Sequence, residues 1–85
     1  MPQISSFYGI TILMFFGDHH PPHFHARYSG QSARVALDGT LLDGDFPRRA
    51  QRLIREWTGL HQDELEACWE RAVRNVPPGT IEPLP

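Results

Sequence analysis

Four of the chain's five histidines lie in one short segment that also carries charged residues. The segment runs from Asp18 to Tyr28 and reads Asp-His-His-Pro-Pro-His-Phe-His-Ala-Arg-Tyr. Histidine is the side chain whose ordinary charge change falls between about pH 5 and 8, and it serves as a general acid or base and as a metal ligand. We therefore expect an active or binding site to begin in this segment.

Three polar side chains of this segment fall on one face of an expected strand. Residues 23–28 alternate polar with apolar or aromatic side chains, and successive side chains of a strand point to opposite faces. His23, His25 and Arg27 therefore share a face. The sequence Ser29-Gly30-Gln31-Ser32 predicts a hairpin turn of type II′ after this strand.

The predicted hairpin register brings charged groups of two strands together. It places His23 opposite Asp38 and Arg27 opposite Arg34, with His25 between the two pairs. A carboxylate beside an imidazole favours the charged ring and orients it. Two arginines that face each other repel, and a bound anion would relieve that repulsion.

This arrangement would suit cleavage of RNA, in which one group removes the proton of the 2′-hydroxyl and another protonates the leaving oxygen. We predict that the catalytic residues are His23, His25 and Asp38. Anion or substrate binding is assigned to His19, Arg27 and Arg34. Anion binding without catalysis and a solvated polar face are the alternatives.

A metal site is a lower-ranked interpretation of the same residues. Nitrogen and oxygen donors are available from His19, His23 and His25 with Asp18 or Asp38. Their spacing matches no standard structural zinc pattern, and no cysteine pair lies nearby. We therefore predict no metal and no cofactor.

Arginine supplies all eight basic side chains, and four arginines crowd the first expected helix. Cations in the first turn of a helix oppose its dipole, so ordinary helix stability does not explain them. Arg48, Arg52 and Arg55 share one side at helical spacing, which predicts contact with an anion or a partner. The alternative is pairing with the nearby carboxylates Asp43, Asp45 and Glu56.

The whole pattern predicts a single α+β domain over residues 1–85. Strand-like segments occupy residues 4–8, 10–16, 23–28, the segment after the turn, and a short stretch near 41–42. Helical periodicity follows over about 47–58, opened by Pro47 and ended by Gly59, and over about 61–75. We expect a mostly antiparallel sheet of four or five strands within about residues 4–45, with both helices on one face. The tail, residues 77–85, is expected to be extended and docked through Ile81 and Leu84.

Composition limits the cellular setting. The single cysteine, Cys68, excludes an intrachain disulfide, and the net charge of −2 argues against polyanion binding by bulk charge. The apolar run at residues 10–16 is too short to span a bilayer, and no basic region precedes it as in a signal peptide. We expect a cytoplasmic protein without a membrane partner. The same run is apolar on both faces, which predicts either a central strand that is partly covered on both faces or a homodimer or partner interface on one of them.

Several motifs are similar to those of a small bacterial family, the domain-of-unknown-function family 4160. In the N-terminal half these are Met1-Pro2-Gln3-Ile4-Ser5, Phe7-Tyr8-Gly9-Ile10, Asp18-His19 and Pro21-Pro22-His23-Phe24-His25-Ala26. In the C-terminal half they are Arg49-Ala50, Trp57, Leu60-His61, Asp63-Glu64-Leu65, Trp69 and Ile81-Glu82-Pro83-Leu84. His19, His23 and His25 occupy positions of the family motif, whereas His20 does not.

The resemblance implies no catalytic residue, because the family has no established activity. Its members often lie beside a gene for another small protein, in pairs that look like toxin–antitoxin modules. The leading hypothesis is therefore a toxin-like component that binds or cleaves RNA through the histidine and arginine face. The acidic balance differs from the basic character common among RNA-cleaving toxins. A non-catalytic, antitoxin-like binding or regulatory module is the alternative, a metal-binding protein ranks third, and the sequence leaves open whether the protein is an enzyme.

Overall fold

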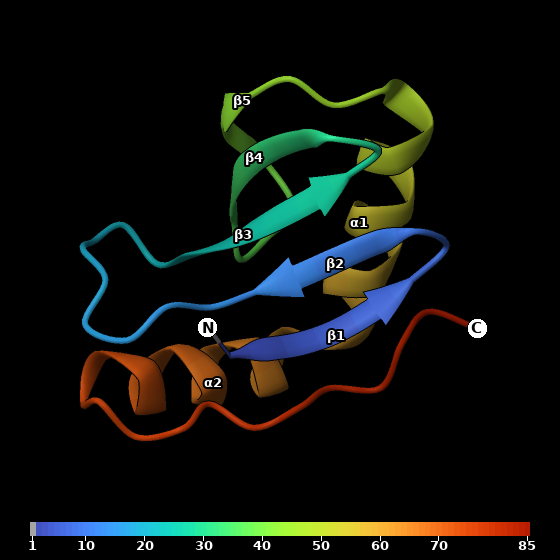
Figure 1. Cartoon of the computed structure of the whole chain (residues 1–85). Helices are drawn as coiled ribbons and strands as arrows, with labels where there is room; N and C mark the ends of the chain where they lie inside the picture. Colours follow the sequence, from blue (N-terminus) through green and yellow to red (C-terminus); the bar gives the residue numbers. More distant parts are fainter. Residues whose placement is uncertain (1) are drawn as a thin grey trace.

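One five-stranded antiparallel sheet forms the centre of the computed structural model, which describes residues 2–85 (Figure 1). Its strands are β1 (Gln3–Phe7), β2 (Ile10–Leu13), β3 (His23–Tyr28), β4 (Gln31–Ala36) and β5 (Leu41–Gly44). They lie side by side in the order of the chain. Two helices follow, α1 (Arg48–Leu60) and α2 (Gln62–Val73). The predicted α+β fold is confirmed.

The hydrophobic core lies between one face of the sheet and the two helices. Trp57 of α1 is fully buried and packs against Phe7 of β1 and Phe24 of β3, with ring centroids 5.2 and 5.7 Å apart. Leu65 of α2 and Val35 of β4 join the same cluster. The apolar stripes of both helices thus cover the face of β3 that carries Phe24, as the alternation predicts.

The β3–β4 hairpin turns one residue earlier than the sequence predicts. Ser29 and Gly30 form the loop with φ values of 49° and 80°, the pattern of a type I′ rather than a type II′ turn. Tyr28 therefore pairs with Gln31, and the predicted register is wrong by two residues. Because the shift is even, each side chain keeps its predicted face but acquires a different cross-strand neighbour.

The segment after β2 leaves the sheet earlier than predicted. Strand pairing ends at Leu13, and the N–H of Gly17 donates to the carbonyl of Ala72 at the end of α2, 2.9 Å away. This bond ties the histidine loop to the second helix.

The helix ends also differ slightly from the prediction. Helix α1 begins at Arg48, one residue later than predicted, with the extended Pro47 as its N-cap. It continues through Gly59 to Leu60, whereas α2 stops at Val73. The left-handed backbone of Asn75, with φ 60°, follows α2. None of the helices in the described part of the chain is long and apolar enough to cross a membrane.

The tail docks as predicted and covers the outer edge of β1 (Figure 1). The N–H of Ile81 donates to the carbonyl of Ile4 over 2.7 Å, and Trp57 Nε1 donates to the carbonyl of Glu82 over 2.9 Å. Ile81 is buried and Leu84 partly buried against the core. The tail therefore supplies hydrogen-bond partners to a carbonyl on the outer edge of β1 and to the buried indole N–H of Trp57.

Two glycines provide a matched test of this fold. Gly44 has φ 96°, and a Cβ there would overlap the carbonyl oxygen of Ser32 and lie 2.7 Å from Cα of Ala33. We expect Gly44→Ala to lower the free energy of unfolding by about 2–4 kcal/mol, because it adds backbone strain and a steric clash. At Gly59 in α1, a Cβ would meet no described atom within 4 Å, so Gly59→Ala should raise that free energy by about 0.5–1 kcal/mol. Urea denaturation measures both, and equal effects of the two substitutions would contradict the geometry.

Candidate functional site

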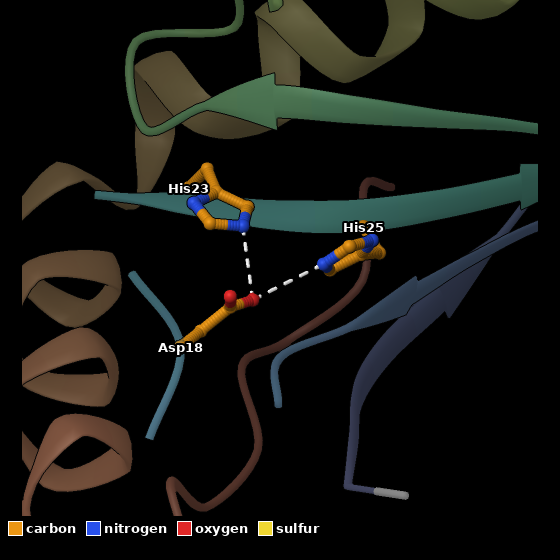
Figure 2. Close-up of side chains that lie close together, drawn as sticks. All are labelled: Asp18, His23 and His25. Carbon is orange, nitrogen blue, oxygen red and sulfur yellow. Dashed lines mark hydrogen bonds and ion pairs between the residues drawn. The ribbon is translucent and has the colours of Figure 1, made fainter. Parts of the chain in front are cut away.

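One carboxylate oxygen lies between two imidazole rings at the start of β3 (Figure 2). Oδ2 of Asp18 is 2.9 Å from Nε2 of His23 and 3.2 Å from Nε2 of His25. The ring centroids of the two histidines are 5.2 Å apart. The three residues therefore form a compact cluster, which we call the Asp18 cluster.

The loop before β3 supplies the carboxylate. Gly17 adopts φ 63°, which reverses the chain after β2, and its N–H bond to Ala72 holds the reversal against α2. Asp18 follows directly and accepts the N–H of His19 on Oδ1 over 2.9 Å. With Oδ1 held in this way, Oδ2 faces the histidines.

His23 is the buried member, with 1% of its surface exposed. Its Nδ1 lies 2.7 Å from the carbonyl oxygen of Pro21, which can only accept, so Nδ1 carries a proton and donates it. Trp69 of α2 covers the ring, with centroids 5.5 Å apart.

The second nitrogen of His23 has no aligned partner. Nε2 is completely buried and makes no hydrogen bond with any described residue, although Oδ2 of Asp18 lies at ion-pair distance. The short contact is thus off the direction in which an N–H would point. A buried polar atom without a hydrogen bond is uncommon in folded proteins and requires a physical account.

His25 is the exposed member. Its side chain is 28% exposed, and its Nε2 donates a hydrogen bond to Asp18, which can only accept while ionised. Phe15 packs edge-on against the ring, with centroids 4.3 Å apart. The cluster is therefore closed on the side of His23 and open to solvent on the side of His25 and Asp18.

The surroundings of Asp18 favour its ionised form. Burial is the largest single influence and opposes ionisation. The hydrogen bonds from the His19 N–H and from His25, with the charges that His23 and His25 carry when protonated, outweigh burial and lower the pKa of Asp18. The cluster thus combines one carboxylate with two imidazoles.

This donor set can do two kinds of chemistry. Two imidazoles on one carboxylate can hold and exchange protons, as in general acid–base pairs. Ligand atoms from Asp18, His23 and His25 also lie within 4.8 Å of one another, close enough to share one metal ion.

The structure brings together two of the three predicted catalytic residues. His23 and His25 meet at the cluster, but His23 lies opposite Ala36 in the sheet, so its predicted pairing with Asp38 is wrong. Asp38 instead accepts the N–H of Thr40 over 2.9 Å in the turn before β5. Asp18 occupies the place that the sequence analysis assigned to Asp38.

The predicted anion-binding residues do not gather at one point. Arg34 lies opposite His25, and its Nε donates to Asp43 over 2.7 Å. Arg27 lies opposite Ser32, so the predicted pairing of Arg27 with Arg34 is wrong. His19 contributes its N–H to Asp18, and its side chain is exposed.

Three arginines of the same predicted set lie elsewhere. They line a groove along α1 and belong to a different element from the cluster: Arg48, Arg52 and Arg55.

Sequence reasoning did not select three residues that shape the cluster. Asp18 was named only as one of two carboxylates for the lower-ranked metal site, and its place beside the histidine run was the available signal. Phe15, just after β2, packs against the ring of His25, and Trp69 of α2 packs against the ring of His23. Their spacing predicts only core positions, because no local pattern shows that an aromatic side chain will meet an imidazole.

Comparison with known proteins gives one match. A family model described as a domain of unknown function, DUF4160, matches residues 9–70. The matched segment includes the Asp18 cluster, all of α1 and most of α2. No curated protein and no solved structure matches the chain.

The role of Asp38 in its turn can be tested by pH. Hydrogen bonds from the N–H and the side chain of Thr40, with the charge of Arg55, hold the pKa of Asp38 below its ordinary value of 3.8. The carboxylate therefore stabilises the fold above that pH, and the stabilisation is lost as the pH falls through the pKa of the folded state. Asp38→Asn keeps an oxygen acceptor but cannot titrate. Between pH 6 and about pH 3, we expect the urea concentration at the midpoint of unfolding to fall further for the wild type than for the variant. If the midpoints of both proteins fall equally with pH, the ionised Asp38 does not stabilise the turn.

Proposed function

We propose that this chain, which belongs to the DUF4160 family of domains of unknown function, binds a divalent transition-metal ion of the zinc type through Asp18, His23 and His25. One observation carries the proposal, namely the buried Nε2 of His23. With Nδ1 donating to Pro21, a neutral ring presents a lone pair at Nε2. That lone pair is 2.9 Å from a carboxylate oxygen, so two electron-rich atoms face each other unless a cation lies between them.

A proton is the simplest cation, but the geometry favours a metal. A proton on Nε2 would give His23 a second N–H donor, at a position that is completely buried. Its N–H would also miss Asp18, since no aligned hydrogen bond joins the two.

The separations of the cluster's atoms resemble those of atoms that share one metal ion. Ligands of a zinc ion with bonds of about 2.0–2.1 Å lie about 3.3 Å apart at the corners of a tetrahedron, and the proton that His25 Nε2 donates to Asp18 would be released when the ion binds. The contacts of 2.9 and 3.2 Å around Oδ2 of Asp18 are close to that separation.

The residues around the cluster support metal binding. A metal-ligating histidine usually donates its other ring N–H to a carboxylate or backbone carbonyl, as His23 does to Pro21. The N–H of His19 holds the distal oxygen of Asp18, and Phe15 and Trp69 restrict the two rings. The ligand atoms are therefore largely preorganised.

Three protein ligands leave at least one coordination position open. Catalytic zinc sites have this composition, with water or substrate in the remaining position, whereas structural sites have four protein ligands. The exposed side of His25 and Asp18 gives that position access to solvent. The proposed ion would lower the pKa of a bound water molecule, so the site suits hydrolytic chemistry.

The toxin-like, RNA-directed role inferred from the sequence stays a prediction. It rests on the family resemblance and on a shared face of histidines and arginines. On that face Arg34 lies opposite His25, whereas Arg27 lies opposite Ser32. The antitoxin-like binding role also stays a prediction.

Metal binding can be measured directly. In calorimetric titrations of untagged, chelator-treated protein with Zn²⁺, we expect one ion per chain. Free Zn²⁺ at about 100 times the Kd should stabilise the fold by about 2.7 kcal/mol. Asp18→Asn and His25→Gln each remove one ligand and should weaken binding at least about a hundredfold.

Two histidine substitutions serve as controls. His19→Gln changes an exposed ring in the same loop, and His61→Gln changes a ring that pairs with Glu64. Both variants should bind Zn²⁺ as the wild type does, and circular dichroism should show that all four variants are folded. Equal losses in the control and ligand variants, or less than one ion per chain in the wild type, would exclude the proposed site.

A further inference from the structure

The basic side of α1 is a second candidate interaction surface. Arg48, Arg52 and Arg55 line a groove of about 330 Å³ together with Gln51. Their spacing along the helix covers about 10 Å at 1.5 Å per residue. We call this surface the arginine groove.

The groove carries positive charge that the chain does not neutralise locally. Within the described residues, neither Arg48 nor Arg52 forms an ion pair. Asp43, which the sequence offered as a local partner, pairs with Arg34 on the sheet instead. The charge of Arg55 acts on the carboxylate of Asp38 in the turn before β5, but no ion pair joins the two among the described residues.

Helix α1 itself is arranged to attract an anion. Its first turn holds no acidic residue, and Pro47 at its N-cap provides no side-chain hydrogen bond. Helix α2 has the opposite arrangement, with Asp63 and Glu64 in the first turn and Arg71 in the last. The positive end of the α1 dipole therefore adds to the arginine charges, whereas α2 compensates its own dipole.

Packing and hydrogen bonding partly fix the lining of the groove. The Arg55 stem lies so close to the turn before β5 that a Cβ on Gly39 would be 2.9 Å from its Cγ. Gln51 donates from Nε2 to the carbonyl of Phe46 over 2.8 Å, which leaves Oε1 as its acceptor. The groove thus combines donors for phosphate with an acceptor for a hydroxyl group.

We propose that the arginine groove binds the backbone of single-stranded RNA. The planar guanidinium group of arginine can donate two parallel hydrogen bonds to phosphate oxygens. The three arginines extend over about 10 Å of the helix, which corresponds to about three phosphates at 3.4 Å per stacked nucleotide. The Gln51 acceptor suits the ribose 2′-hydroxyl, which is the group that distinguishes RNA from DNA. The proposal does not depend on the metal site, because the groove lies on a different element.

Fluorescence anisotropy with a labelled 12-nucleotide RNA tests the proposal on the full chain, with EDTA present to exclude metal effects. Replacing Arg48, Arg52 and Arg55 together by Gln should weaken binding at least about tenfold near 0.1 M salt. The association constant for RNA should also depend less steeply on salt: the negative slope of its logarithm against the logarithm of salt concentration should shrink by about 2. Arg52→Gln should weaken binding more than Arg49→Gln, a matched loss of one charge on the same helix outside the groove.

Other probes distinguish the sources of negative charge. DNA of the same sequence should bind several-fold more weakly than RNA, and Gln51→Leu should remove that difference. Inorganic polyphosphate or a polyglutamate peptide that binds as tightly as RNA would overturn the assignment to RNA. Equal effects of Arg49→Gln and Arg52→Gln would overturn the assignment to the groove.

Discussion

The alternation of β3 joins the hydrophobic core to the candidate site. Phe24 and Ala26 are fully buried on one face, where Phe24 meets Trp57, and His25 projects from the other face. Because successive side chains of a strand point in opposite directions, a slip of one residue would expose Phe24 and bury His25. The free energy gained by burying Phe24 in the core therefore also keeps the side chain of His25 on the opposite face of the sheet.

His23 lies where three elements meet, which explains why it is buried and polar at once. Strand β3 begins there, Trp69 of α2 covers the ring, and the preceding loop supplies Pro21 and Asp18. A buried polar atom is costly unless it is satisfied. The proposed metal ion accounts for the nitrogen that no aligned hydrogen bond satisfies. The bond from Gly17 to Ala72 positions the loop, so the cluster depends on α2 as well as on the sheet.

The two proposed interactions use different parts of a molecule whose charge is unevenly distributed. The chain has a net charge of −2, yet α1 is rich in arginine and α2 is rich in carboxylates. Bulk charge therefore excludes only polyanion binding by the whole surface, not by one helix face. Both helices use their apolar stripes for the core, which leaves the arginine side of α1 accessible.

Local sequence patterns determined the strands, the helices, the faces of β3 and the arginine row, because alternation and helical spacing depend on residues only a few positions apart. They also identified His23 and His25 as central. The cross-strand neighbours were not determined in this way, since Ser29-Gly30 and Gly30-Gln31 are both plausible central pairs and the choice moves every partner by two residues. Only the tertiary structure decided that Asp18, rather than Asp38, meets the histidines. That contact requires the loop to fold back between β3 and α2, and its geometry depends on packing between segments more than fifty residues apart in the sequence.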